Sequence, residues 1–226
     1  MTVINFALLP DGVFVVADTL VTNDRFKPSF FTSKVHVLPH LNGLVCGTGN
    51  LRFILDWSRH LLGGMLAVDV AHLDEFVQDS LRSLHASRPA AERDTLTSTI
   101  YHLGFDERED RFVGFAYRST ANFASERLDY GVRTKPGYSG ELPMERFPDD
   151  FVEVCRAQRA EQDRLPPDER VFIGGHVVAY MMQVDRTEGR SPSVVTTVTR
   201  PFEFEDLDRA YHVCTASLAA NVHLRD

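Results

Sequence analysis

The sequence predicts an α+β protein in which helices pack on antiparallel sheets. Three observations lead to this class: strands and helices come in separate blocks, two segments carry apolar residues at helical spacing, and short turn signals join neighbouring strands. A chain of 226 residues with 43% hydrophobic and 25% charged residues fits one globular domain over residues 1–226.

The first fifty residues are expected to form four short strands. Val3 to Leu9 and Val13 to Ala17 are rich in apolar and β-branched residues, and the Pro10-Asp11-Gly12 signal between them predicts a hairpin. Further strands are expected at residues 34–38 and 44–46. The stretch 24–33, which precedes these two strands, is mixed and polar and contributes no strand.

Two helices are expected next, at residues 51–62 and 68–84, because both segments repeat apolar residues at helical spacing. Asn50 is expected to cap the first helix and Gly63-Gly64 to end it. Residues 89–94 are expected to form a linker, since Pro89 disfavours continuation of the second helix.

The second half of the chain is expected to add more strands and two more helices. The predicted strands cover residues 98–105, 112–117, 126–134, 171–184 and 193–199. The predicted helices cover residues 149–164 and 204–221.

Composition narrows the classes of function and location. The net charge is −8 and the basic residues are scattered, which disfavours nucleic-acid binding. Three cysteines without a pattern indicate a reducing compartment, and we expect neither a signal peptide nor a membrane span, hence a cytoplasmic protein. No cofactor or metal site is expected: His36 and His40 are four apart, but Pro39 precludes a shared helical face.

Thr2 is the first candidate for chemistry. Removal of Met1, which is usual before a small residue, would place a free α-amine beside the Thr2 hydroxyl. Such an amine has a pKa of about 7.7–8.0 and can act as the base that a threonine nucleophile needs. The alternative is that Thr2 is simply the second residue of a cytosolic protein.

Asp18 and Lys34 follow Thr2 at two successive intervals of sixteen residues. A two-residue turn at positions 11–12 would set Asp18 opposite Asn5, about 10 Å along the strand from Thr2, so no direct contact is expected. Lys34 could bridge the gap by pairing with Asp18 and lowering the pKa of the Thr2 hydroxyl. The alternative is a surface ion pair at the end of a strand.

The glycines of Gly47-Thr48-Gly49 could present backbone N–H groups to an oxyanion. The alternative is an ordinary turn from strand to helix.

Together these residues resemble the proteasome-like N-terminal nucleophile (Ntn) hydrolases, the family of proteasome β subunits and their bacterial relatives. The family has an N-terminal Thr, an Asp ending the second strand, a Lys opening the third and a Gly after the fourth. These positions are matched by Thr2, Asp18, Lys34 and Gly49. The loop between Lys34 and Gly49 is one residue longer than in the family, so Gly47 is an alternative to Gly49 for binding the oxyanion. The segment 174–180 is similar to the family's late Gly-Gly strand, and Ser139-Gly140 to its Ser-Gly before the third helix.

The resemblance implies a four-layer αββα sandwich with two antiparallel sheets between helix layers, a homo-oligomer, and a peptide or amide substrate. The Thr2 hydroxyl would attack the carbonyl and the Thr2 amine would accept the proton. Lys34, held by Asp18, would stabilise the developing charge, the Gly49 N–H would hold the oxyanion, and Ser139 would be the counterpart of the family's serine.

The sequence also departs from the family. Active subunits usually carry an Asp and a Ser shortly before the late Gly-Gly, where this chain has Arg170 and Ile173, with Asp168 two residues out of register. A non-catalytic scaffold or binding subunit on the same fold is therefore the rival interpretation, and an Ntn amidase acting on a small metabolite is a third.

Overall fold

A computed structural model describes residues 3–23, 25–64, 66–93, 95–141, 145–187 and 193–222. In this part of the chain the protein is a mixed α/β structure with five α-helices and three antiparallel sheets, which is compatible with the α+β class. The helices are α1 (Leu51–Gly64), α2 (Val70–Ala86), α3 (Ala90–Arg93), α4 (Asp149–Gln162) and α5 (Leu207–Val222).

The first large sheet has the strand order β10-β1-β2-β11-β12. Its strands are β1 (Ile4–Leu9), β2 (Gly12–Asp18), β10 (Gly131–Lys135), β11 (His176–Asp185) and β12 (Ser193–Glu203). The second large sheet, in chain order, consists of β5 (Val35–Leu38), β6 (Gly43–Gly49), β7 (Ser98–Asp106), β8 (Arg111–Arg118) and β9 (Ser125–Arg127). A small hairpin joins β3 (Leu20–Thr22) to β4 (Pro28–Phe31).

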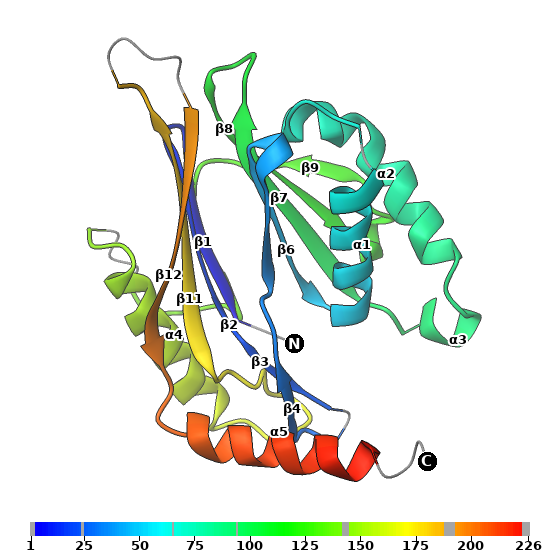
Figure 1. Ribbon diagram of the computed structural model, residues 1–226, viewed down its shortest axis with the longest axis vertical. Coiled ribbons are helices and arrows are strands. Elements are labelled where there is room, and N and C mark those ends of the chain that lie inside the picture. The colour runs from blue at the N-terminus through cyan, green and yellow to red at the C-terminus, as the bar shows by residue number, and fades with distance from the viewer. Residues whose placement is uncertain are drawn as a thin grey trace.

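The two large sheets pack face to face, with helices on their outer faces (Figure 1). Phe6 of β1 packs against Tyr101 of β7 between the sheets, with ring centroids 5.3 Å apart. Trp57 of α1 is buried on the outer face of the second sheet, and Cys155 of α4 packs on the outer face of the first. Because both faces of β1 are covered, its sequence is a continuous apolar run apart from Asn5.

The register of the first hairpin differs from the prediction. Leu9 pairs with Gly12 and Ile4 with Ala17, so the turn residues are Pro10 and Asp11. The predicted placement of Asp18 opposite Asn5 is therefore wrong by two residues. Proline suits the first central position of a β-turn because its φ angle is already set, and this favours the observed turn.

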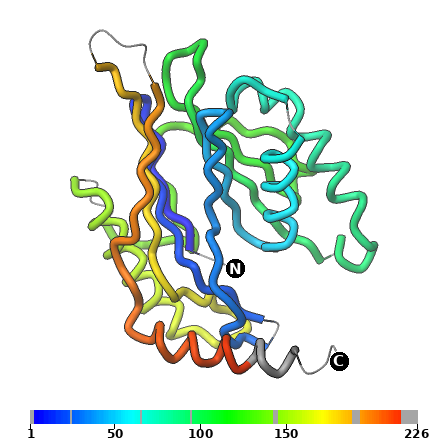
Figure 2. Tube along the Cα trace, in the orientation of Figure 1, coloured from blue at the N-terminus to red at the C-terminus, as the bar shows by residue number. Residues whose placement is uncertain are grey.

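The predicted strand 126–134 is two strands in different sheets. β9 pairs with β8 in the second sheet, whereas β10 pairs with β1 in the first. Between them the chain crosses from one sheet to the other, as the green segment of Figure 2 shows, and Leu128 is buried in the core between the sheets. Such a crossing depends on tertiary packing and leaves no break in the local strand pattern.

Three smaller differences concern the segments between elements. The stretch 24–33 contains β4, which begins at Pro28, a position in a strand where proline is tolerated. The linker 89–94 contains the short helix α3, which starts just after Pro89. Helix α1 runs through Gly63 to Gly64 instead of ending before them.

The predicted helix α1 and its cap are confirmed: the Phe53 N–H donates to Asn50 Oδ1 at 2.9 Å. Helix α2 has its own cap, because the His72 N–H donates to Asp69 Oδ1 at 2.7 Å. Among the described helices, none combines the length and the apolar composition that a bilayer crossing requires.

Candidate active site

Asp18, the last residue of β2, is the centre of the candidate site. Its side chain is fully buried. Oδ1 accepts hydrogen bonds from the Val3 N–H at 3.1 Å and from Lys34 Nζ at 2.6 Å, while Oδ2 accepts one from the Gly174 N–H at 3.1 Å. A buried carboxylate requires such donors, and these three come from segments far apart in the sequence.

Lys34 lies just before β5 and is also buried, with 4% of its side chain exposed. Its Nζ donates a second hydrogen bond to Leu20 O at 2.6 Å. Burial lowers the pKa of Lys34, and the charge of Asp18 and the hydrogen bond to it oppose that shift by raising the pKa. The alternative of a surface ion pair is therefore wrong: the pair is buried and each partner depends on the other.

Thr2 lies outside the described residues, and its role stays a prediction. The described chain begins with Val3, which is fully buried and bound through its N–H to Asp18. The observed hairpin register places Val3 beside Asp18. The separation of about 10 Å between Asp18 and Thr2 was expected from a turn at positions 11–12, and that turn is not the observed one.

Gly47 and Gly49 are glycines for different structural reasons. A Cβ on Gly47 would lie 2.7 Å from Thr99 O and 3.2 Å from the Ile54 side chain of α1, so Gly47 allows the helix to approach the sheet. Gly49 ends β6 with φ +103°, and a Cβ there would lie 1.9 Å from Thr97 O. Gly49 also lines a cavity.

This cavity, which we call the Gly49 cavity, has a volume of about 380 Å³. It is bounded by Thr48-Gly49 at the end of β6, residues 97–99 at the start of β7, residues 119–120 after β8 and residues 135–137 at the end of β10, with Val171 completing the lining. Lys135 pairs with Ile4 across β10 and β1. The cavity therefore lies next to the start of the described chain.

Ser139 is placed on the segment between β10 and α4 and is exposed. Its Oγ lies 3.4 Å from Glu161 Oε1 on α4. This contact ties the segment to the helix, and the role of Ser139 at the candidate site stays a prediction.

The contribution of the Gly174 N–H to Asp18 was missed by sequence reasoning. Next to it, the Thr19 hydroxyl oxygen accepts a hydrogen bond from the His176 N–H at 2.9 Å, and the Leu20 N–H donates to Gly174 O at 3.1 Å. The signal was present in the adjacent glycines 174 and 175, but nothing local in the sequence connects them with Asp18.

The residues at which the sequence departs from the family have other contacts. Ile173 is buried in the core under α4. The guanidinium of Arg170 lies over the Phe172 ring, 4.3 Å from its centroid, and Asp168 is exposed. The described structure therefore gives positions 170 and 173 packing roles.

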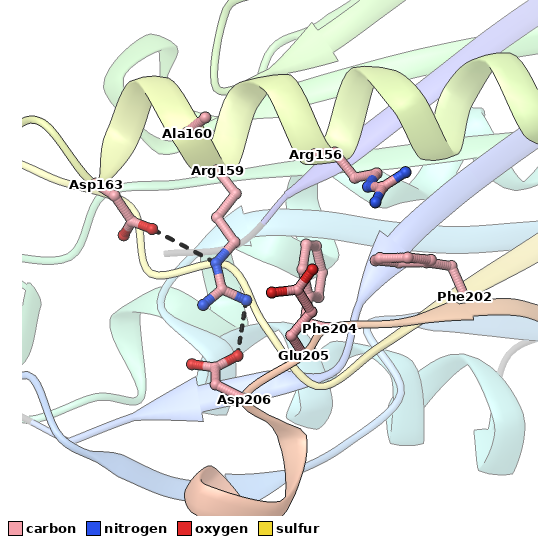
Figure 3. Close-up of a pocket in the computed structure, with 8 residues that line it drawn as sticks. All are labelled: Arg156, Arg159, Ala160, Asp163, Phe202, Phe204, Glu205 and Asp206. Carbon is pink, nitrogen blue, oxygen red and sulfur yellow. Dashed lines mark hydrogen bonds and ion pairs between the residues drawn. The ribbon is translucent and has the colours of Figure 1, made fainter.

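A second cavity, of about 400 Å³, lies between α4 and the end of β12 (Figure 3). Arg159 in its wall reaches Asp206 at 2.8 Å and Asp163 at 3.5 Å, and it lies over the ring of Phe204. The Arg159–Asp206 pair connects α4 to the start of α5, whereas Asp163 lies at the end of α4 itself. The lining shares no residue with the Asp18–Lys34 site, and we assign it a structural role.

The potential metal ligands of this chain are its His, Cys, Asp and Glu side chains. The part of the chain that the structure describes contains no group of three or more of them arranged to hold a metal ion.

Gly49→Ala is expected to destabilise the protein by more than about 2 kcal/mol, because the new Cβ meets a backbone carbonyl and the φ angle is unfavourable for alanine. Gly63→Ala in α1 is the matched control, since a Cβ there meets nothing within 4 Å. It is expected to be neutral or to stabilise by up to about 1 kcal/mol. Urea unfolding of both variants measures the difference, and equal stabilities would contradict the geometry assigned to Gly49.

No protein-family model matches this chain, and no curated protein matches it.

Proposed function

We propose that this chain is a proteasome-like N-terminal threonine hydrolase, which cleaves peptide or amide bonds through Thr2 after removal of Met1. One observation carries the proposal: the buried Asp18–Lys34 pair is bound to the N–H of Val3, the residue that follows Thr2. Consecutive Cα atoms are about 3.8 Å apart, so this contact holds the pair next to the proposed nucleophile.

The proposed reaction uses Thr2, the Asp18–Lys34 pair and Gly49. The Thr2 hydroxyl attacks the carbonyl carbon of the substrate, and the α-amine of Thr2 takes up the hydroxyl proton and passes it to the leaving amine. The positive charge of Lys34, held by Asp18, stabilises the oxygen nucleophile, and the backbone N–H of Gly49 binds the oxyanion. Water, activated by the same amine, then hydrolyses the acyl-enzyme and restores Thr2.

The arrangement of layers supports the same proposal. Two antiparallel sheets pack on each other, α1 and α2 lie outside one sheet, and α4 lies outside the other. This is the order of layers that the resemblance implies for an αββα Ntn sandwich. Under the proposal the chain is a single cytoplasmic domain that forms a homo-oligomer, and its three free cysteines fit a reducing compartment.

A non-catalytic scaffold or binding subunit on the same fold is the second candidate. The observation that favours it is the pair of positions 170 and 173, where Arg170 stacks on Phe172 and Ile173 is buried in the core. Neither side chain offers the carboxylate or the hydroxyl with which active members of the family support the nucleophile.

Intact mass spectrometry of the protein, before and after treatment with a peptide epoxyketone, separates the two candidates. The expected result is loss of Met1 and a single covalent adduct on Thr2, because an epoxyketone requires a hydroxyl and an α-amine on the same residue. Thr2→Ala should give no adduct, whereas Thr22→Ala, at the end of β3, should react as the unaltered protein does. Retained Met1 without an adduct would favour the non-catalytic candidate.

A further inference from the structure

Lysine is rare in this chain. Only three of its 24 basic residues are lysines: Lys27, Lys34 and Lys135. Lys34 is the buried partner of Asp18, and Lys135 lines the Gly49 cavity. Two of the three lysines therefore lie near the start of β1. Apart from Lys27, all the other residues among the 24 are arginines.

Lys135 is positioned by the sheet. It is the last residue of β10, it pairs with Ile4, and its N–H donates to Asn5 Oδ1 at 3.3 Å. Its backbone is thus attached to β1 next to Val3. The side chain is exposed and is the one charged group among the described lining residues of the Gly49 cavity, so no carboxylate of the lining neutralises it.

The rest of the lining supplies hydroxyl groups. The hydroxyl-bearing residues are Thr48, Thr97, Ser98, Thr99, Ser119 and Thr120. Ser98 Oγ accepts a hydrogen bond from the Asn50 N–H, and Ser119 Oγ accepts one from the Ser98 N–H, each at 3.0 Å, so these two side chains also order the wall. A cavity with one cation, several hydroxyl donors and no carboxylate complements an anion.

We propose that the Gly49 cavity binds a carboxylate of the substrate and that Lys135 is the residue that selects it. The hydrolase would then prefer peptides or amides with an acidic side chain on the acyl side of the scissile bond. The proposal rests on the proposed function, because the cavity is a substrate subsite only if Thr2 is the nucleophile. A lysine suits this position because its compact ammonium can direct three donors at a carboxylate of variable orientation.

The first test compares fluorogenic peptide amides that have Glu or Gln before the scissile bond. The Glu substrate should have a kcat/KM higher by about tenfold or more, the effect of one charge-assisted hydrogen bond. Lys135→Gln should remove this preference and Lys135→Glu should invert it. Lys27→Gln is the matched control, because Lys27 is exposed on the β3–β4 hairpin and is expected to leave the preference unchanged.

The second test does not require catalysis. Amine acetylation of the Thr2→Ala protein is followed by mass spectrometry with and without N-acetylglutamate, and N-acetylglutamine serves as the neutral comparison. N-acetylglutamate should protect Lys135 severalfold and leave Lys27 reactive. If no peptide is cleaved and Thr2 is not labelled, the proposed function fails, and the acetylation result still shows whether the cavity binds carboxylates. Cleavage without Glu preference, or equal labelling of Lys135 with and without N-acetylglutamate, would overturn the inference.

Discussion

Lys34→Met is expected to lower the free energy of unfolding by about 3–5 kcal/mol. The substitution keeps a long unbranched side chain but removes the cation beside the fully buried Asp18, whose other described donors are the backbone N–H groups of Val3 and Gly174. Removal of one partner from a buried ion pair is among the most destabilising changes in a protein core. Urea unfolding at neutral pH measures the effect.

Arg59→Met is the control for the loss of an ordinary ion pair. Arg59 pairs with Asp56 on α1, and its side chain is 73% exposed, so the expected change is below about 1 kcal/mol. If Lys34→Met lowered the free energy of unfolding as little as Arg59→Met does, the burial of the Asp18–Lys34 pair would be contradicted.

The double variant Asp18→Asn/Lys34→Met separates stability from chemistry. It removes both charges of the described ion pair and should recover part of the stability lost in Lys34→Met. Epoxyketone labelling of Thr2 should nevertheless remain lost, because no cation stabilises the nucleophile. If labelling returned with stability, Lys34 would have only a structural role.

Acidification is expected to destabilise the fold from about pH 6.5 downward, and His102 carries a large share of the effect. His102 is fully buried in β7, where Nε2 accepts a hydrogen bond from Trp57 Nε1 at 2.9 Å. Burial lowers the pKa of His102 from 6.5 to about 3. Between these values the unfolded chain binds a proton that the folded protein does not, so unfolding becomes easier by at most about 1.4 kcal/mol per pH unit.

Urea unfolding between pH 7 and pH 4 tests this, with His102→Gln as the variant. Glutamine can still accept from Trp57 but does not titrate, so the slope of stability against pH should be smaller than in the unaltered protein. His40→Gln is the control, because His40 is exposed. The pKa values of His36 and His176 are lowered by burial too. The quantity to compare is therefore the difference in the slope of stability against pH between His102→Gln and the unaltered protein. If the free energy of unfolding fell with pH equally steeply in His102→Gln and the unaltered protein, His102 would not be a source of the acid sensitivity.

Local sequence signals predicted most of the helices and strands. The apolar spacing at 51–62 and 68–84 located α1 and α2 within a few residues, and Asn50 caps α1 as expected. These signals succeed because helix periodicity and capping depend on neighbours three or four positions away. The prediction of one strand over 126–134 was wrong because the division of this segment between two sheets depends on which distant strands pair with β9 and β10.

The sequence by itself determined the α+β order of elements and the spacing of Thr2, Asp18 and Lys34. Only the tertiary structure decided that Asp18 lies beside Val3, because a shift of two residues in a hairpin leaves every side chain on the same face and the hydrophobic pattern unchanged. It also decided the Gly174 contact and the Gly49 cavity, which join segments more than a hundred residues apart. Such contacts arise from sheet pairing and packing, which no local pattern records.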